Sequence, residues 1–332
     1  MANVIEINSL TKRFKELTAV DSISLGIKEG EIFGLLGPNG AGKTTAISML
    51  VTMKKPTAGT ARVNGFDIVK EADGVRKSIG IVFQDPSLDE ELTAFENLEL
   101  HAAMYGIPAA ERKGRIHEVI AMVELEDRLH DIVKTFSGGM RRRLEIARGL
   151  LHSPKILFLD EPTIGLDPQT RKHVWDYIVK LRKEHGITIV MTTHYMEEAD
   201  SLCDRVAIID TGKIIALDTP SALKDSLGGD IVLIKTPQAQ KMADAAKSIV
   251  KKSKVDDGAV SLSLQQAEKK ITVLMDLARE NRIEVLSVSI HKPTLDDVFL
   301  HYTGKNIRAE TASPKDAMRM RRNAMGGMRG RR

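Results

Sequence analysis

Short apolar runs separated by turn residues dominate the first part of the chain and predict strands there. Residues 4–14 and 22–27 alternate between apolar and polar positions, as two antiparallel strands of a half-exposed sheet would. Other runs are apolar at most positions, without alternation, which is typical of parallel strands covered on both faces. These runs lie at 32–36, 156–160 and 187–193, and further strands are expected at 59–63 and 79–83.

The pattern changes to a helical period between about residues 85 and 151. Gly106-Ile107-Pro108 separates two helices there, and Met140, Leu144, Ala147 and Leu151 recur at helical spacing. Residues 168–185 predict another helix, and 205–217 predict a hairpin that turns at Thr211-Gly212. Residues 1–222 therefore predict an α/β core with an antiparallel β edge and a helical subdomain at about 85–151.

A second pattern begins after Gly228-Gly229. It reads strand, helix, two strands, helix, strand, an order typical of a small ferredoxin-like α+β domain. We expect this domain at 230–304. Its strands are predicted at 231–235, near 254–255, at 260–264 and at 283–290, and its helices at 238–252 and 266–281.

Charge separates the end of the chain from the rest. Residues 305–332 carry nine Lys/Arg against two Asp/Glu, so the basic excess of the 332-residue chain lies in this tail. With little apolar surface, the tail is expected to be disordered. It either contacts anionic lipid weakly or only improves solubility.

Composition also limits the compartment. The single cysteine, Cys203, excludes an internal disulfide, fits a reducing compartment and is expected to be a buried apolar residue. No apolar run is long enough to cross a bilayer, and no signal peptide is recognisable at the start. We therefore expect a protein of the cytosol or of the cytosolic side of a membrane.

The strongest motif is a phosphate-binding loop between the apolar run 32–36 and a helix predicted at 45–53. Backbone N–H groups of such a loop surround a polyphosphate, Lys43 adds a positive charge, and the Thr44 hydroxyl can hold Mg²⁺. Thr45 opens the helix whose N-terminus points at the anion. A glycine-rich turn without a ligand is the alternative. The motif residues are Gly37, Pro38, Asn39, Gly40, Ala41, Gly42, Lys43 and Thr44.

Further motifs follow the loop in a fixed order. They are Phe136-Ser137-Gly138-Gly139-Met140, Asp160-Glu161-Pro162, Gly165-Leu166-Asp167 and His194. Each alone is weak, but together they resemble the ATP-binding-cassette (ABC) ATPases over residues 1 to about 222. The resemblance implies ATP and Mg²⁺ as ligands.

The resemblance assigns roles to single residues around the phosphates. Asp160 ends an apolar strand, where its carboxylate can order the Mg²⁺ hydration shell together with Thr44. Glu161 would polarise the attacking water, and His194 would contact the γ-phosphate. Gln84 would touch Mg²⁺ or that water. Each residue also has an alternative role without a ligand. These are a helix cap for Asp160, a surface ion pair for Glu161, a structural role for His194 and a surface position for Gln84.

The resemblance also implies residues that bind the adenine base and residues that contact ATP across a dimer interface. Phe14 would stack on adenine, unless it only packs under the edge sheet. Ser137, Gly138 and Gly139 offer a second anion site, or a simple helix cap. In the family, ATP lies between the phosphate loop of one copy and this motif of another, with Asp167 helping across the interface.

One residue of the second motif departs from the common pattern. Met140 stands where glutamine is common, so we expect a weaker nucleotide contact at this position. The basic run that follows, Arg141-Arg142-Arg143, is expected to be a solvated helix face rather than a ligand site.

Two longer segments narrow the resemblance to the daunorubicin-resistance type of ABC subunit. They are residues 136–144 and the segment Pro293-Thr294-Leu295-Asp296-Asp297-Val298-Phe299-Leu300. This implies an ATPase that dimerises around ATP and drives a separate transmembrane permease from the cytoplasmic side, for export of a hydrophobic compound or drug. It implies no specific nucleic-acid partner. The alternatives are an ATP-driven clamp on nucleic acid or ribosomes, and a nucleotide-regulated interaction protein without turnover.

Overall fold

The computed structural model describes residues 3–304 of the chain. It divides into two compact units, the first ending at Leu217 and the second beginning at Asp218. Each unit has its own sheets and buried apolar core. The domain limits expected from the sequence, 1–222 and 230–304, stay predictions, and the basic tail lies outside the described residues.

The antiparallel edge of the first unit is a four-stranded sheet with the order β2-β1-β4-β5. Its long strands are β1 (Asn3–Phe14) and β2 (Leu17–Lys28), and its short ones are β4 (Ala58–Val63) and β5 (Phe66–Asp67). Ile5 and Leu10 of β1 are fully buried, whereas Glu6 and Asn8 between them are exposed. The alternation that predicted these strands therefore separates a core face from a solvent face.

A six-stranded sheet forms the centre of the first unit, with the order β10-β9-β3-β8-β7-β6. Five of its strands are parallel, and they meet with their carboxyl ends at one edge. Every residue of the three middle strands is buried, as their mostly apolar runs predict. The strands are β3 (Ile32–Leu36), β6 (Ile79–Val82), β7 (Ile156–Asp160), β8 (Thr188–Thr193), β9 (Arg205–Asp210) and β10 (Lys213–Asp218).

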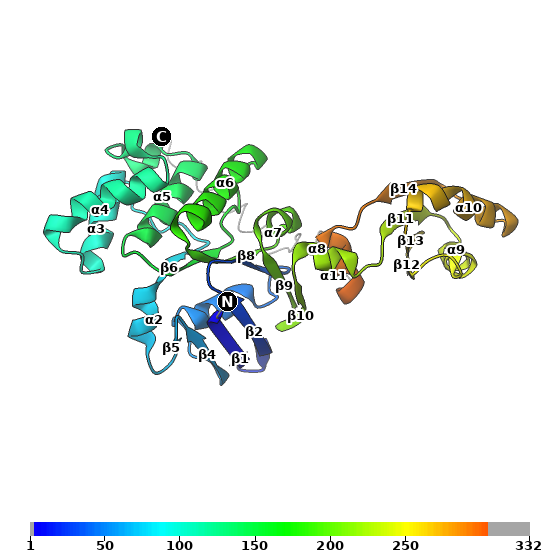
Figure 1. Ribbon diagram of the computed structural model, residues 1–332, viewed down its shortest axis with the longest axis horizontal. Coiled ribbons are helices and arrows are strands. Elements are labelled where there is room, and N and C mark those ends of the chain that lie inside the picture. The colour runs from blue at the N-terminus through cyan, green and yellow to red at the C-terminus, as the bar shows by residue number, and fades with distance from the viewer. Residues whose placement is uncertain (1–2, 305–332) are drawn as a thin grey trace, which may run out of the picture. The chain divides into compact units, whose positions relative to one another are not determined.

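Three helices of the first unit, in its helical subdomain, lie side by side in Figure 1. Helix α1 (Lys43–Leu50) belongs to the core cluster that joins the two sheets, through residues such as Ile47 and Met49. The expected helical subdomain contains α3 (Ala94–Met104), α4 (Ala109–Met122) and α5 (Gly138–Leu150), with two short 3₁₀ turns before α5. Helix α6 (Pro168–His185) has the bounds that the sequence predicts.

Three short helices were missing from the sequence prediction. They are α2 (Ala72–Ser78), α7 (Met196–Leu202) and α8 (Pro220–Asp225). With six or seven residues each, they span fewer than two turns, so no helical period can develop in the sequence.

The second unit contains a four-stranded antiparallel sheet with the order β12-β13-β11-β14. This order, with a helix after the first and third strands, is that of the predicted ferredoxin-like domain. Helix α9 (Ala239–Ala246) is shorter than predicted, because residues 247–251 form a turn that leads into the strand β12 (Lys252–Asp256). The other elements are β11 (Asp230–Lys235), β13 (Ala259–Leu264), α10 (Ala267–Glu280), β14 (Ser287–His291) and α11 (Leu295–Thr303).

Two compositional expectations can be compared with the structure. Cys203 is buried, as predicted, and burial raises the pKa of its thiol. Within residues 3–304, no helix combines the length and the apolar character that crossing a membrane demands.

Candidate active site

The loop after β3 owes its shape to glycines. The Gly37 N–H donates to the Thr193 carbonyl at 3.2 Å, and a Cβ on Gly37 would lie only 2.2 Å from the Ile209 carbonyl oxygen. Gly42 has φ +106°, and a Cβ there would lie 2.4 Å from the Ala19 carbonyl oxygen. Only glycine fits both positions, so the loop can deliver the N-terminus of α1 to the carboxyl edge of the sheet. The exposed residues of this segment are Asn39, Gly40 and Thr44, and Thr45 is half-buried.

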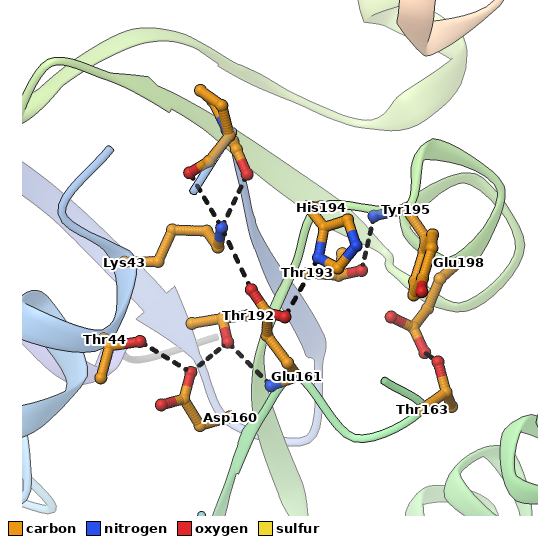
Figure 2. Close-up of polar contacts among 12 residues, drawn as sticks. Lys43, Thr44, Asp160, Glu161, Thr163, Thr192, Thr193, His194, Tyr195 and Glu198 are labelled. Carbon is orange, nitrogen blue, oxygen red and sulfur yellow. Dashed lines mark hydrogen bonds and ion pairs between the residues drawn. The ribbon is translucent and has the colours of Figure 1, made fainter. Parts of the chain in front are cut away.

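Lys43 places a buried positive charge inside this loop. Its Nζ donates to the Gly37 carbonyl at 2.7 Å and to the Pro38 carbonyl at 3.1 Å, and it lies 3.3 Å from Glu161 Oε1. Burial lowers the pKa of the Lys43 ammonium, and the charge of Glu161 offsets part of this effect. Figure 2 shows the Lys43 side chain reaching from α1 toward Glu161 at the end of β7.

Asp160 and Thr44 bring two oxygen ligands together from different elements. The Thr44 hydroxyl donates to Asp160 Oδ1 at 3.3 Å, and the Thr192 hydroxyl of β8 donates to the same oxygen. Asp160 and Thr192 are direct partners in the parallel pairing of β7 and β8. A carboxylate and a hydroxyl at this edge are the hard oxygen ligands that Mg²⁺ prefers.

Glu161 and His194 form the second contact between the ends of β7 and β8. His194 Nδ1 lies 3.0 Å from Glu161 Oε2 (Figure 2), and both side chains are nearly buried. Burial alone would raise the pKa of Glu161. The His194 hydrogen bond and the Lys43 charge outweigh it and hold that pKa below its ordinary value. The carboxylate therefore stays ionised at neutral pH, as a group that takes up a proton from water must be.

A second buried carboxylate supports the segment that follows Glu161. Glu198 of α7 is fully buried, and its Oε1 accepts hydrogen bonds from the Thr163 hydroxyl at 2.8 Å and from the Trp175 indole at 2.9 Å. Burial raises the pKa of Glu198, and these hydrogen bonds offset part of the rise. Glu198 thereby ties the segment after the expected base to α6 and α7.

The Ser137 motif caps the helix α5. The Ser137 hydroxyl accepts a hydrogen bond from the Met140 N–H at 3.2 Å. The helix cap that the sequence offered as an alternative to an anion site is therefore present. Ser137 and Gly138 are exposed, whereas Gly139 packs so closely on Thr170 that a Cβ would lie 2.4 Å from its methyl carbon. The exposed pair can still offer an N–H and a hydroxyl to a second molecule.

Asp167 caps the next helix in the same way. It is exposed at the start of α6, where Oδ1 accepts from the N–H groups of Gln169 and Thr170. Hydrogen bonds from the Thr170 side chain and backbone lower the pKa of Asp167.

Phe14 and Gln84 lie outside the cluster around Glu161. The Phe14 ring is 41 % exposed, so it does not pack under the edge sheet, and Lys12 Nζ lies 5.1 Å from its centroid. The exposed Gln84 follows β6 and lines a separate pocket with Gly138, Pro162 and Leu166.

Sequence reasoning missed the polar residues that hold the others in place. Thr192 was one of them, although two adjacent threonines at the end of the run 187–193 signal a polar neighbour at the strand end. Glu198 carries no such signal, because a glutamate near the start of a helix is usually exposed.

The chain matches known families along most of its length. The family model described as ABC transporter matches residues 20–164, and the model described as ATP-binding protein DrrA1-3-like, C-terminal domain, matches residues 219–303. The daunorubicin/doxorubicin resistance ATP-binding protein DrrA of Streptomyces peucetius is 42% identical over 306 residues, which covers 90% of this chain and 92% of that protein. The linearmycin resistance ATP-binding protein LnrL of Bacillus subtilis is 39% identical over 311 residues and is covered completely, against 92% of this chain.

Solved structures match about two thirds of the chain. One is cbiO1 from Clostridium perfringens, part of the ABC transporter complex cbiONQ, with a TM-score of 0.64 and 29% identity over 68% of this chain and 94% of that one. Another is the dimeric structure of MJ0796, a bacterial ABC transporter cassette, with a TM-score of 0.58 and 31% identity over 65% of this chain and 98% of that one. The same cassette has been solved in a post-hydrolysis state bound to ADP and Pi.

Fold and site together define an ATP-hydrolysing cassette. The chain belongs to the ABC transporter ATP-binding subunits of the daunorubicin-resistance type. It is an ATPase that drives a separate permease, and relatives in this family form dimers. This similarity extends over nine-tenths of the chain. It does not favour the alternative function, an ATP-driven clamp on nucleic acid or ribosomes.

Proposed function

We propose that this subunit powers export of a hydrophobic compound or drug from the cytoplasmic side of the cell membrane. The names of its relatives, which confer resistance to daunorubicin, doxorubicin or linearmycin, support this cargo class. One observation supports ATP hydrolysis as the energy source. It is that Lys43, Asp160, Glu161 and His194 lie together at one edge of the sheet. Selectivity for the cargo then belongs to the permease.

The chemistry at this edge is positioning and charge neutralisation. Backbone N–H groups of the loop and the Lys43 ammonium bind the phosphates, and Phe14 stacks on the adenine. Thr44 and Asp160, together with Gln84 from the loop after β6, would hold Mg²⁺, which would supply further neutralising charge when bound. Their hydroxyl, carboxylate and amide oxygens fit this ion.

The Glu161 carboxylate orients the attacking water and accepts a hydrogen bond from it. His194 holds one oxygen of this carboxylate through Nδ1. With both ring nitrogens protonated, its Nε2–H can also donate to a γ-phosphate oxygen. Loss of the γ-phosphate therefore removes contacts at both residues.

A second copy of the chain completes each site. Ser137, Gly138 and Asp167 are exposed, so they can face the phosphate loop of a partner copy in a head-to-tail dimer with two composite sites. A related cassette has been solved as a dimer, which supports this arrangement. ATP then joins the two copies, and hydrolysis lets them separate.

Mixing two inactive variants tests the composite site. Lys43→Met disables the loop, and Ser137→Arg blocks the partner motif, so each homodimer is expected to be inactive. In a mixed dimer, one site combines both defects and the other has none. An equal mixture should therefore recover up to about a quarter of wild-type phosphate release, because about half of random dimers are mixed.

The double variant that carries both changes in one chain is the matched control. Mixed with wild type, it leaves one defect in each site of the mixed dimer and should add no activity. A mixture of the single variants that stays as inactive as its components would contradict the composite site.

The permease and its cargo call for a separate experiment. Co-purification of the tagged chain from detergent-solubilised native membranes should recover a multi-span membrane protein. Inverted vesicles that contain both proteins should then accumulate daunorubicin only with ATP. Accumulation without ATP, or none with it, would contradict the proposed cargo.

A further inference from the structure

An arginine that the sequence placed on a solvated helix face is buried beside the active site. Arg142 of α5 is 7% exposed, in contrast to its half-buried neighbours Arg141 and Arg143. A buried guanidinium is costly unless its N–H groups find acceptors. Its surroundings supply four, so the expectation of a solvated residue was wrong for Arg142.

Two of these acceptors flank the expected catalytic base. Arg142 Nη2 donates to the Asp160 carbonyl at 3.0 Å, and Nε donates to the Pro162 carbonyl at 2.8 Å. Glu161, between them, has φ +48°, a left-handed conformation that costs energy in any residue except glycine. Such a conformation persists where the surroundings hold it, and the guanidinium holds the backbone on both sides.

The other acceptors belong to the loop that leads into the helical subdomain. Arg142 Nη1 donates to the Phe83 carbonyl at 2.7 Å, directly before Gln84, and to Glu145 Oε2 at 2.7 Å. Glu145, itself buried, accepts the Ser87 N–H through its other oxygen at 3.0 Å. One guanidinium thus joins the start of α5, the Gln84 loop and the backbone of Glu161.

We propose that Arg142 is a positioning residue for ATP hydrolysis, which sets the direction of the Glu161 carboxylate and links it to the Gln84 loop. The proposal rests on the proposed role of Glu161 as the group that orients water. Only the planar, multiply donating guanidinium can reach the carbonyls of residues 83, 160 and 162 at once. An ammonium in its place would keep the charge and lose this geometry.

The test compares Arg142→Lys with Arg143→Met in the full-length protein. Arg143, one residue further along α5, donates to the carbonyls of Val123 and Glu124, away from the sheet edge. We expect Arg142→Lys to lower kcat about tenfold or more, with the Kd for ATP changed less than about threefold, because the misplaced base affects chemistry more than binding. Arg143→Met should change both by less than about twofold.

A double variant separates positioning from general stability. If Arg142 acts through Glu161, Arg142→Lys should lower kcat in the wild-type background and add no further loss in a Glu161→Gln background. Glu161→Gln alone tests the role of Glu161, so failure of that role is distinguishable. An equal loss in both backgrounds, or wild-type kcat for Arg142→Lys, would overturn the proposal. If Arg142→Lys does not fold, Glu145→Gln, which keeps the shape of the partner, is compared in the same two backgrounds.

Discussion

Replacing Glu161 by glutamine should slow ATP turnover by about 10²- to 10⁴-fold, the usual contribution of a positioned general base. The amide has the size of the carboxylate but cannot take up a proton from water. Lys43 and the loop glycines remain, so ATP should still bind, and the ATP-bound dimer should accumulate. Phosphate release and size-exclusion chromatography with ATP and with ADP measure the two effects.

An exposed glutamate on α6 supplies the control for this variant. Glu184→Gln makes the same chemical change near the end of that helix and should leave turnover unchanged. Two results would count against the role of Glu161. One is wild-type turnover of Glu161→Gln, and the other is a variant that stays monomeric with saturating ATP.

Replacing Lys43 by methionine should weaken ATP binding by about 10- to 100-fold, because a hydrogen bond to a charged group contributes roughly 1.5–3 kcal/mol. Methionine fits the space of the buried side chain without its charge. Turnover should fall further, since the positive charge on the phosphates is also lost in the transition state. Titration with a fluorescent ATP analogue gives the affinity, and phosphate release gives the turnover.

The variant also removes the ion pair to Glu161, so its fold must be checked. Glu161 keeps the hydrogen bond of His194, and we therefore expect a folded protein by circular dichroism. Lys54→Met changes an exposed lysine just after α1 and should bind ATP as the wild type does. A folded Lys43→Met protein with ATP affinity within twofold of wild type would refute the assignment.

The residues that meet at the sheet edge were predictable because each follows an apolar run. Asp160 ends one buried parallel strand and His194 follows another, and in a parallel sheet those ends share one edge. The glycine loop added the third component. The resemblance to the ABC ATPases assigned these side chains to one site, the parallel topology agrees with their convergence, and the structure supplied the distances between them.

Helix α5 shows why other parts were not predictable. An apolar stripe of Leu144 and Ala147 suggested one buried face, but Arg142, Glu145 and Arg148 are buried as well. The helix is enclosed on most of its circumference, and its charged residues bond to backbone groups of distant loops. A sequence period reports apolar burial, whereas these polar contacts depend on the tertiary structure.

The chain has one tryptophan, and its position makes it an intrinsic fluorescent probe of the first unit. The Trp175 indole is hydrogen-bonded to Glu198, which also holds Thr163, two residues beyond the base. The fluorescence of an indole depends on such polar neighbours. Fluorescence excited selectively in Trp175 therefore reports on the surroundings of the sheet edge that holds Glu161. The second unit contains no tryptophan, so it does not contribute to this fluorescence. Rearrangement of the first unit can therefore be followed in the unmodified full-length protein.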